Sequence, residues 1–465
     1  MSTTTAKIKK KNVMPEIKLN DELEVNIEKL SNLGLGIAKV DGFVIFVENA
    51  CPQDVLKIKI TKVTKNYAKA KILEVMSPSK HRTSPFCPMQ KVCGACQLQY
   101  INYNYQLELK REVVQDAIRK IGHLDIEIPN PVPSPLIKAF RHKIQYPVCQ
   151  TKVSKRLLAG YYKPHTHDIV NIKYCPIQPE ICDKIVDFIR EKAPEYRISG
   201  YDEKKHAGDL KHIVIRNSAA TGENLVVLVV NSKQNSTNYK NLAQSIYENF
   251  AEVSGVCLNY NTKKTNVIMS ENTECICGKP VIEEKILGKT FYIGTNTFFQ
   301  VNPKSAENIF RYVKDYIAAN FENPVVLDAY AGISAFGICV SDVCDKVVSV
   351  EENTDSCRLA EDSLELNNIN NLEIHNEDAA KFFAKEKRKF DAVILDPPRK
   401  GCSVESLDEA VRLCNNTIIY VSCNPATLAR DLKYLTEKGC RVQSIQPFDM
   451  FCHSFHIENV AIIQG

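Results

Sequence analysis

The stretch VVLDAYAG at residues 325–332 has the pattern of a buried parallel strand that ends in a tight loop. It opens a region where short apolar runs alternate with amphipathic helical stretches. Such alternation is typical of a parallel sheet covered by helices on both faces. The sequence therefore predicts an α/β fold, with a Rossmann-like seven-stranded domain over residues 291–465. The expected strands are residues 325–330, 347–352, 372–375, 392–396, 417–422, 442–446 and 459–463.

Residues 18–76 have a different pattern, with short and evenly spaced strands. Leu56, Ile58 and Ile60 alternate with Lys57 and Lys59, so one face of their strand is apolar and the other is basic. Strands of this length and spacing predict a small β-barrel. Its lysine face is a candidate surface for phosphate groups.

The other segments complete the expected domain organisation, since a chain of 465 residues is long enough for about three domains. Residues 1–17 are rich in Lys, Ser and Thr and are expected to form a disordered basic tail. Residues 77–290 are expected to form a mixed α/β central domain. A helix expected over residues 103–121 is a candidate to pack on the last domain.

The bulk composition is that of a globular protein, with 44% hydrophobic and 25% charged residues. The net charge of +5 permits a nucleic-acid partner without requiring one. Since there is no long apolar run and no secretory signal, we expect a cytoplasmic protein without a membrane partner. Its 18 cysteines should then be reduced thiols. A monomer is the default expectation.

Carboxylates at two strand ends predict a nucleoside site. Asp328 lies in the first strand, and Glu351 ends the second, where a carboxylate can accept hydrogen bonds from ribose hydroxyls. Ser334 stands where a second glycine would let the backbone approach a pyrophosphate. The loop therefore disfavours a dinucleotide and suits S-adenosylmethionine, which has a ribose but no phosphate.

A cysteine thiol is found at the end of the fifth expected strand. The fourth strand ends in DPPR (residues 396–399), whose prolines stiffen the loop, and the fifth ends in Ser422-Cys423. Carbon 5 of uracil is a weak nucleophile, but a thiolate that adds to carbon 6 makes carbon 5 electron-rich enough to attack a methyl sulfonium. A base must then remove the proton from carbon 5. Glu458, at the start of the last strand, is the natural candidate.

With these residues in view, the sequence resembles a known family. FQVN (residues 299–302), DPPR, SCNP (422–425) and HIE (456–458) follow the order found in RNA uracil-5 methyltransferases with an N-terminal TRAM domain and an iron–sulfur cluster, in particular the bacterial 23S ribosomal RNA enzymes. The resemblance extends from about residue 18 to residue 464. It implies a TRAM barrel, a domain that binds S-adenosylmethionine and an RNA substrate, foremost 23S ribosomal RNA.

Carried over residue by residue, the resemblance makes Cys423 the nucleophile and Glu458 the general base. The residues that it implies for the S-adenosylmethionine site are Gln300, Tyr330, Glu351, Asp378 and Asp396. The chain departs from the family pattern at four positions. Three of them concern how tightly the cofactor is bound, and the fourth lies in another loop. They are Ala331 and Ser334, where a Cys and a second Gly are usual, Ala335 in place of a polar residue, and Cys452 in place of a Pro.

Four cysteines have the spacing of a metal site. Cys87, Cys93 and Cys96 lie close together, and Cys175 supplies a fourth thiolate. Four thiolates suit either zinc or an iron–sulfur cluster, and the spacing alone does not separate the two. The resemblance favours a 4Fe-4S cluster, because the same cysteines match the family's ligands. A structural or RNA-positioning role is expected, since the uracil reaction needs no electrons.

Three alternatives stay open at this point. A cytosine-5 RNA methyltransferase would need a second cysteine after the fourth strand, and Cys402 stands there. A tRNA uracil-5 methyltransferase would use the same chemistry on another RNA. A metal-stabilised RNA-binding protein with decayed catalysis is suggested by the changes at Ala331, Ser334 and Ala335.

Overall fold

A computed structural model of the protein describes residues 17–465. The tail expected over residues 1–17 lies outside the described residues, apart from Ile17. The chain divides into two compact units. Among the described residues, the first comprises residues 17–85 and Gln97–Leu109, and the second comprises Phe86–Cys96 and Lys110–Gly465. Along the described residues, no helix is both long and apolar enough to cross a membrane.

The first unit is built around a six-stranded sheet in the order β1-β5-β6-β4-β3-β2. Leu56, Ile58 and Ile60 of β5 are fully buried, while Lys57 between them is exposed, so the predicted apolar face of this strand is confirmed. The strands are β1 (Glu22–Asn26), β2 (Lys29–Leu30), β3 (Gly36–Val40), β4 (Phe43–Val47), β5 (Val55–Val63) and β6 (Tyr67–Ser77). Helix α1 (Tyr103–Lys120) begins in this unit and ends in the second.

The central part of the second unit is a mixed sheet in the order β12-β11-β10-β9-β7-β8. Only β10 and β11 pair in parallel, and helix α3 is part of the connection between them. The elements are β7 (Lys143–Gln150), β8 (Leu157–Ala159), α2 (Glu180–Glu195), β9 (Leu210–Asn217), β10 (Asn224–Val230), α3 (Thr237–Asn249), β11 (Val253–Tyr260) and β12 (Thr273–Gly278). A hairpin of β13 (Val281–Ile286) and β14 (Lys289–Gly294) follows.

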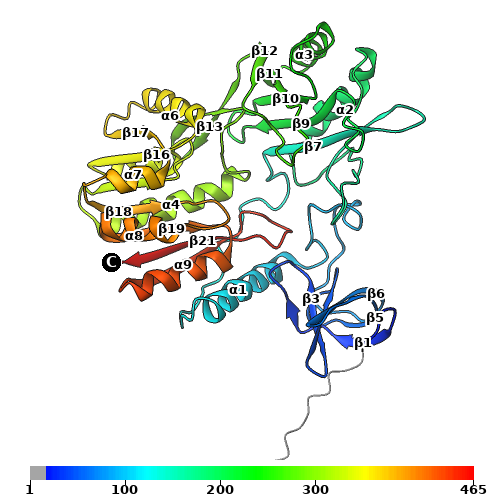
Figure 1. The fold of residues 1–465 in the computed structure, drawn as a ribbon, viewed down its shortest axis with the longest axis horizontal. Helices are drawn as coiled ribbons and strands as arrows, with labels where there is room; N and C mark the ends of the chain where they lie inside the picture. The colour runs from blue at the N-terminus through cyan, green and yellow to red at the C-terminus, as the bar shows by residue number, and fades with distance from the viewer. Residues whose placement is uncertain (1–16) are drawn as a thin grey trace, which may run out of the picture. The chain divides into compact units, whose positions relative to one another are not determined.

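The C-terminal part is the predicted seven-stranded sheet, in the order β17-β16-β15-β18-β19-β21-β20 (Figure 1). The first five strands pair in parallel, and β21 runs antiparallel between β19 and β20. The strands are β15 (Val325–Ala329), β16 (Lys346–Glu351), β17 (Leu372–Asn376), β18 (Phe390–Leu395), β19 (Cys414–Ser422), β20 (Arg441–Phe448) and β21 (Glu458–Gln464). All seven expected strands are present, and their bounds differ from the predicted ones by a few residues at most.

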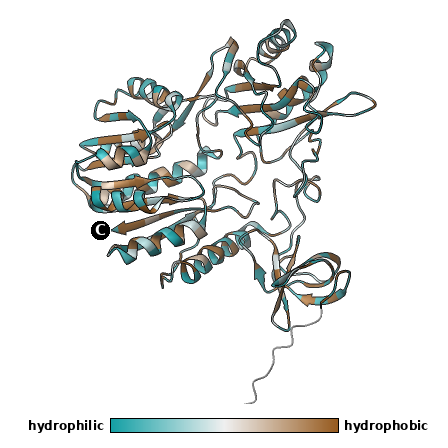
Figure 2. Ribbon diagram, viewed as in Figure 1, coloured by the Kyte–Doolittle hydropathy of each residue, from teal (hydrophilic) through white to brown (hydrophobic). Residues whose placement is uncertain are grey.

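Hydrophobic cores lie on both faces of this sheet, whose strands are mostly coloured as hydrophobic in Figure 2. One core contains α4 (Pro303–Asn320) and α5 (Ala335–Val340) together with strands of the central sheet. The other contains α7 (Ala379–Lys385), α8 (Val404–Leu413) and α9 (Pro425–Glu437). Helix α6 (Thr354–Leu366) joins β16 to β17. The second core also includes Val114 and Ile118 of α1, so the end of this helix packs on the sheet's helical layer.

Candidate active site

The carboxyl ends of the five parallel strands meet at one edge of the sheet, where ligands bind in folds of this kind. Strand β21 runs the other way, so its first residues reach the same edge. Ser422 pairs with Asn459 in the β19–β21 ladder. Continuing that register by one residue sets Cys423 opposite Glu458. The fold therefore brings the predicted nucleophile and the predicted base together, although 34 residues of chain lie between them.

Cys423 is partly buried, just beyond the end of β19. Burial raises the pKa of its thiol to about 11, and the nearby carboxyl of Glu458 adds to this. Arg399 acts in the opposite direction, since its guanidinium hydrogen-bonds to the sulfur and lowers the thiol pKa. The thiol is thus protonated near neutral pH, and Arg399 is the cation placed to stabilise its thiolate.

Glu458 is 6% exposed, and burial raises the pKa of its carboxyl well above the usual range. Asp396 raises it further, whereas Arg399 lowers it. Burial among protein atoms also raises the pKa of Asp396 to about 7. Asp396 and Glu458 lie near each other, and both favour their neutral forms. A cation that bound beside them would stabilise their ionised forms, so the site favours a positively charged ligand.

The loop after β18 is hydrogen-bonded to the first turn of α9. The carbonyl of Arg399 accepts hydrogen bonds from the Asn424 amide at 3.3 Å and from the Thr427 hydroxyl at 3.3 Å. Asn424 also caps α9, because its side-chain oxygen accepts from the Ala426 N–H at 3.1 Å. The two loops that carry Arg399 and Cys423 are therefore hydrogen-bonded to each other. Arg399 and Asn424 lie within the DPPR and SCNP motifs, but the sequence alone indicates no role for either residue.

The predicted cofactor residues follow the neighbouring strand ends. Tyr330 comes directly after β15 with a φ of 61°, a left-handed conformation that turns the loop sharply. The carboxylate of Glu351 accepts hydrogen bonds from the N–H groups of Gly332 at 2.8 Å and Asn353 at 2.8 Å. Glu351 thus ties the loop after β15 to the end of β16, and it lies where a ribose-binding carboxylate is expected.

The other two predicted cofactor residues are less closely tied to this edge. Asp378 is exposed and caps α7 by accepting from the Lys381 N–H at 3.1 Å, yet it lies near enough to raise the pKa of Tyr330. Gln300 is partly buried on the segment between β14 and α4. Within residues 17–465, no hydrogen bond joins Gln300 to the other predicted cofactor residues.

Asp328 is a carboxylate whose environment the sequence did not reveal. It is fully buried, and its Oδ2 accepts from the Gly337 N–H at 2.9 Å, while Oδ1 has no partner among the described residues. Burial raises its pKa to about 7, and Asp396 adds to the increase. Ser334, one of the departures from the family pattern, is buried with a φ of 56°, and its hydroxyl lies 2.6 Å from that of Ser349. This serine therefore has a packing role in the loop.

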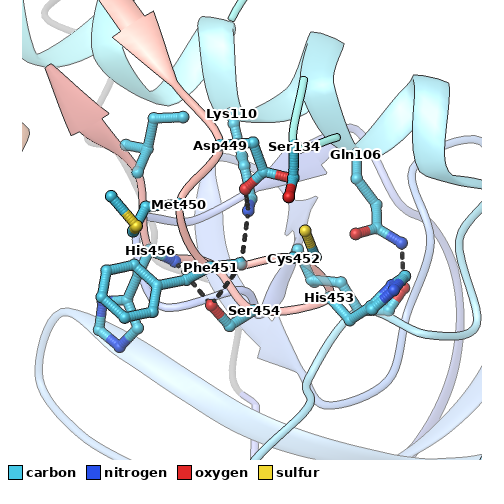
Figure 3. A network of polar contacts seen from close by, with 12 residues as sticks. Gln106, Lys110, Ser134, Asp449, Met450, Phe451, Cys452, His453, Ser454 and His456 are labelled. Carbon is cyan, nitrogen blue, oxygen red and sulfur yellow. Dashed lines mark hydrogen bonds and ion pairs between the residues drawn. The ribbon is translucent and has the colours of Figure 1, made fainter. Parts of the chain in front are cut away.

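The segment that leads from β20 to Glu458 is anchored by a buried ion pair. Lys110 of α1 is 2% exposed, and its Nζ lies 2.5 Å from a carboxylate oxygen of Asp449. The same ammonium donates to the carbonyl of Phe451 at 3.0 Å, as Figure 3 shows. The Asn302 amide, from the cap of α4, donates to the carbonyl of Met450 at 3.1 Å. Both contacts fix the backbone at Met450 and Phe451, in the segment that leads to the predicted base.

The four predicted cluster cysteines lie close enough to influence one another. Cys87 raises the thiol pKa of Cys93, and Cys96 and Cys87 raise that of Cys175, although burial is the main cause in both cases. The Gly94 N–H donates to the carbonyl of Tyr162 at 3.0 Å, and a Cβ at position 94 would lie 2.9 Å from that oxygen. In the described part of the chain, however, no three His, Cys, Asp or Glu side chains form a group that could hold a metal ion.

Cys402, which kept the cytosine-5 alternative open, is buried at 7% exposure in the core beneath α8 and α9. Its backbone N–H donates to the Tyr420 hydroxyl at 3.2 Å and to Asp431 at 3.1 Å. Burial raises the pKa of its thiol to about 11. This environment is that of a packing residue.

Comparison with known proteins gives matches over nearly the whole chain. The family model for tRNA (uracil-5-)-methyltransferase matches residues 211–464, and that for the TRAM domain matches residues 18–73. An uncharacterised RNA methyltransferase of Clostridium tetani is 34% identical over 450 residues, which cover 96% of this chain and 97% of the relative. One of Bacillus cereus is 35% identical over 454 residues, covering 96% and 98%.

A solved structure is similar over the same length. The crystal structure of Pyrococcus abyssi tRNA (uracil-54, C5)-methyltransferase in complex with S-adenosyl-L-homocysteine superposes with a TM-score of 0.75 at 27% identity. The match covers 95% of this chain and 100% of the other. S-adenosylhomocysteine is what remains of S-adenosylmethionine after methyl transfer, so the neighbour's fold holds this cofactor.

Proposed function

Because this chain belongs to the tRNA (uracil-5-)-methyltransferase family, we propose that it methylates carbon 5 of a uridine in RNA through a covalent bond to Cys423. The chain is an RNA methyltransferase with a fold that uses S-adenosylmethionine. The covalent route is the part that we propose here. The observation that carries it is the β19–β21 register, which sets a thiol and a carboxyl side by side at the ligand-binding edge.

The reaction divides into three steps. The Cys423 thiolate adds to carbon 6, and the electron pair of the ring's double bond moves onto carbon 5 and the carbonyl at carbon 4 as an enolate. Carbon 5 then attacks the sulfonium methyl group, and S-adenosylhomocysteine leaves with the electron pair of the broken bond. Finally a base removes the proton from carbon 5, the double bond re-forms and Cys423 departs as thiolate.

The charges around Cys423 suit this sequence. Arg399 stabilises the thiolate, both when it attacks and when it leaves. Asp396 and Glu458 carry raised pKa values, and a sulfonium cation beside them would favour their ionised forms. Glu458 would then hold a carboxylate in place for the proton on carbon 5, which is the role of a general base.

The cofactor would lie along the loops that follow β15, β16 and β18. Glu351 is placed for the ribose hydroxyls, and Tyr330 and Asp396 border the same edge. Gln300 and Asp378 are further candidates, from the segment before α4 and the end of β17. Calorimetry with S-adenosylmethionine on the Glu351→Ala protein tests this assignment, with at least about tenfold weaker binding expected.

We also propose that Cys87, Cys93, Cys96 and Cys175 hold a 4Fe-4S cluster, with zinc as the less favoured occupant. The donor set supports this, because four thiols are the ligands that such clusters use, and Cys87 acts electrostatically on both Cys93 and Cys175. The cluster would join the segment Phe86–Cys96 to the central sheet and would take no part in the methyl transfer. Iron and acid-labile sulfide analysis of anaerobically purified protein would distinguish it from zinc.

For the RNA we propose 23S ribosomal RNA, on the family pattern of TRAM domain plus cluster. Transfer RNA is the second candidate, because the structural neighbour is a tRNA (uracil-54, C5)-methyltransferase. The TRAM domain supports RNA binding in either case. A cytoplasmic location and a monomeric state stay predictions from the sequence.

Nucleoside mass spectrometry tests the proposal. Purified protein, S-adenosylmethionine and either a 23S ribosomal RNA or a transfer RNA transcript should yield 5-methyluridine, with the ribosomal transcript as the better substrate. The Cys423→Ala protein should still bind the cofactor but lose at least about 10⁴-fold in turnover. Formation of 5-methylcytidine, or wild-type turnover by Cys423→Ala, would overturn the proposal.

A further inference from the structure

A cavity in the second unit lies apart from Cys423 and has no part in the reaction described so far. Its volume is about 480 Å³, and it opens between the central sheet and the start of α6. Lys143 of β7 and Arg216 of β9 line it, together with Asn353, the cap of α6. Asn353 follows Glu351 by two residues, so the cavity adjoins the edge proposed for the cofactor.

Within residues 17–465, neither basic side chain has an acidic partner. Arg216 is 3% exposed and donates to the carbonyls of Thr295 and Thr297, but its Nε has no partner among the described residues. Lys143 is partly buried, and within residues 17–465 neither side chain forms an ion pair. Buried charges normally pair with an opposite charge or bind a ligand, because desolvation is costly.

The charges that act on Lys143 are those of Arg216 and Arg141, and both are positive. Together with burial, they lower the pKa of Lys143 to about 7. Two carboxylates, Glu271 and Asp355, also line the cavity, but both residues are exposed to solvent, where water screens their charge. The less exposed charged residues of the lining are therefore the basic ones, and an anion that entered would meet them on two adjacent strands.

We propose that this cavity binds a backbone phosphate of the RNA substrate, through Lys143 and Arg216. The inference rests on the proposed function only in taking RNA as the substrate. A phosphodiester suits the site better than the cofactor does, because the carboxylate of S-adenosylmethionine is accompanied by its own ammonium group. A phosphate held here would fix the strand beside the edge where Cys423 and Glu458 lie.

The test compares three single substitutions in the full-length protein, using a short fluorescent single-stranded RNA that contains uridine. Lys143→Met should weaken binding about tenfold and reduce the slope of log Kd against log salt concentration by about 0.7 to 1. Lys143→Arg should restore both. Lys240→Met, which removes an exposed lysine of α3, is the matched control for net charge and should change Kd less than about twofold.

Calorimetry with the cofactor and a methyl-transfer assay of the wild-type protein make the outcome decisive. Calorimetry with S-adenosylmethionine should give the same Kd for wild type and Lys143→Met. Weaker cofactor binding with unchanged RNA binding would show that the cavity serves the cofactor and would overturn the proposal. Equal losses for Lys143→Met and Lys240→Met would also overturn it. If wild-type protein binds RNA in this pattern but transfers no methyl group, the phosphate site stands and the proposed function fails.

Discussion

The two sheets of the second unit have opposite electrostatic character. The edge of the C-terminal sheet collects carboxyl groups whose pKa values are raised: Asp328, Asp396 and Glu458. The central sheet carries two basic residues, Lys143 and Arg216, that have no acidic partner among the described residues. Both arrangements cost stability in the protein alone. Each becomes favourable with a ligand of opposite charge, a sulfonium in the first and a phosphate in the second.

The largest expected effect concerns the carboxyl-rich edge. In the Glu458→Gln protein the amide cannot accept the proton from carbon 5, so turnover should fall about 10²- to 10⁴-fold. The thiol-linked RNA adduct should accumulate, because methyl transfer precedes the blocked step. A denaturing gel would show it as a slowly migrating band that contains both protein and labelled methyl group. Near-normal turnover without such a band would mean that Glu458 is not the base.

Stability measurements compare Lys110, which has a buried acidic partner, with Lys143, which has none in the described part of the chain. Lys110→Met leaves Asp449 as a buried charge without its partner and should lower the free energy of unfolding by about 3–5 kcal/mol. Lys143→Met removes a basic side chain that has no acidic partner within residues 17–465, and it should leave that free energy unchanged or higher. Denaturant unfolding, followed by a probe of the second unit, measures both.

Lys120→Met is the control for Lys110→Met on the same helix. Lys120 pairs with Asp116 at 2.7 Å, but both side chains are exposed, so this loss should cost less than about 1 kcal/mol. Equal destabilisation by Lys110→Met and Lys143→Met would contradict the contrast between the two sheets.

The buried Asp328 should make stability depend on pH. Its folded-state pKa of about 7 lies above the ordinary value of 3.8, so the folded protein binds the proton more tightly than the unfolded chain does. The resulting stabilisation is complete below the ordinary pKa and is lost as pH rises towards the folded-state value. Across that window the free energy of unfolding should fall by up to about 4 kcal/mol, and Asp328→Asn should remove this component. Parallel pH profiles for the two proteins would refute the assignment.

The smallest effect expected here concerns Arg399, the cation at the carboxyl-rich edge. Arg399→Met removes the group that lowers the thiol pKa of Cys423, so the pH dependence of kcat/KM should shift to higher pH. At neutral pH the loss should be about tenfold, and it should shrink as pH rises. Arg358→Met is the control, because this exposed arginine of α6 pairs only with Asp362 among the described residues. A loss that is the same at every pH would assign Arg399 to binding instead.

The sequence predicted the fold well because local patterns determine it. Alternating apolar and helical runs defined all seven strands of the C-terminal sheet, and the basic and apolar faces of β5 followed from a period of two. The motifs at strand ends predicted the edge for Cys423, because parallel strands bring their carboxyl ends together. Glu458 reaches the same edge for another reason, since β21 begins there and runs antiparallel to β19.

Features that depend on packing could not be predicted in this way. Lys110 and Asp449 lie 339 residues apart in the chain, and no local pattern marks either as the other's partner. The sequence also does not show which of the adjacent residues Phe298 and Phe299 is buried. In the structure Phe298 is 59% exposed and Phe299 is 5% exposed and packed in the core, because only one of two adjacent side chains can face inward there.

The central claim is the bond between Cys423 and carbon 6 of the target uridine. An RNA substrate with 5-fluorouridine at the methylated position tests it most directly, since a base cannot remove fluorine from carbon 5 as it would remove a proton. We predict a protein–RNA adduct that survives denaturation and carries the transferred methyl group, and peptide mass spectrometry should locate it on Cys423. An adduct on another cysteine, or none under conditions where the unmodified RNA is methylated, would contradict the account.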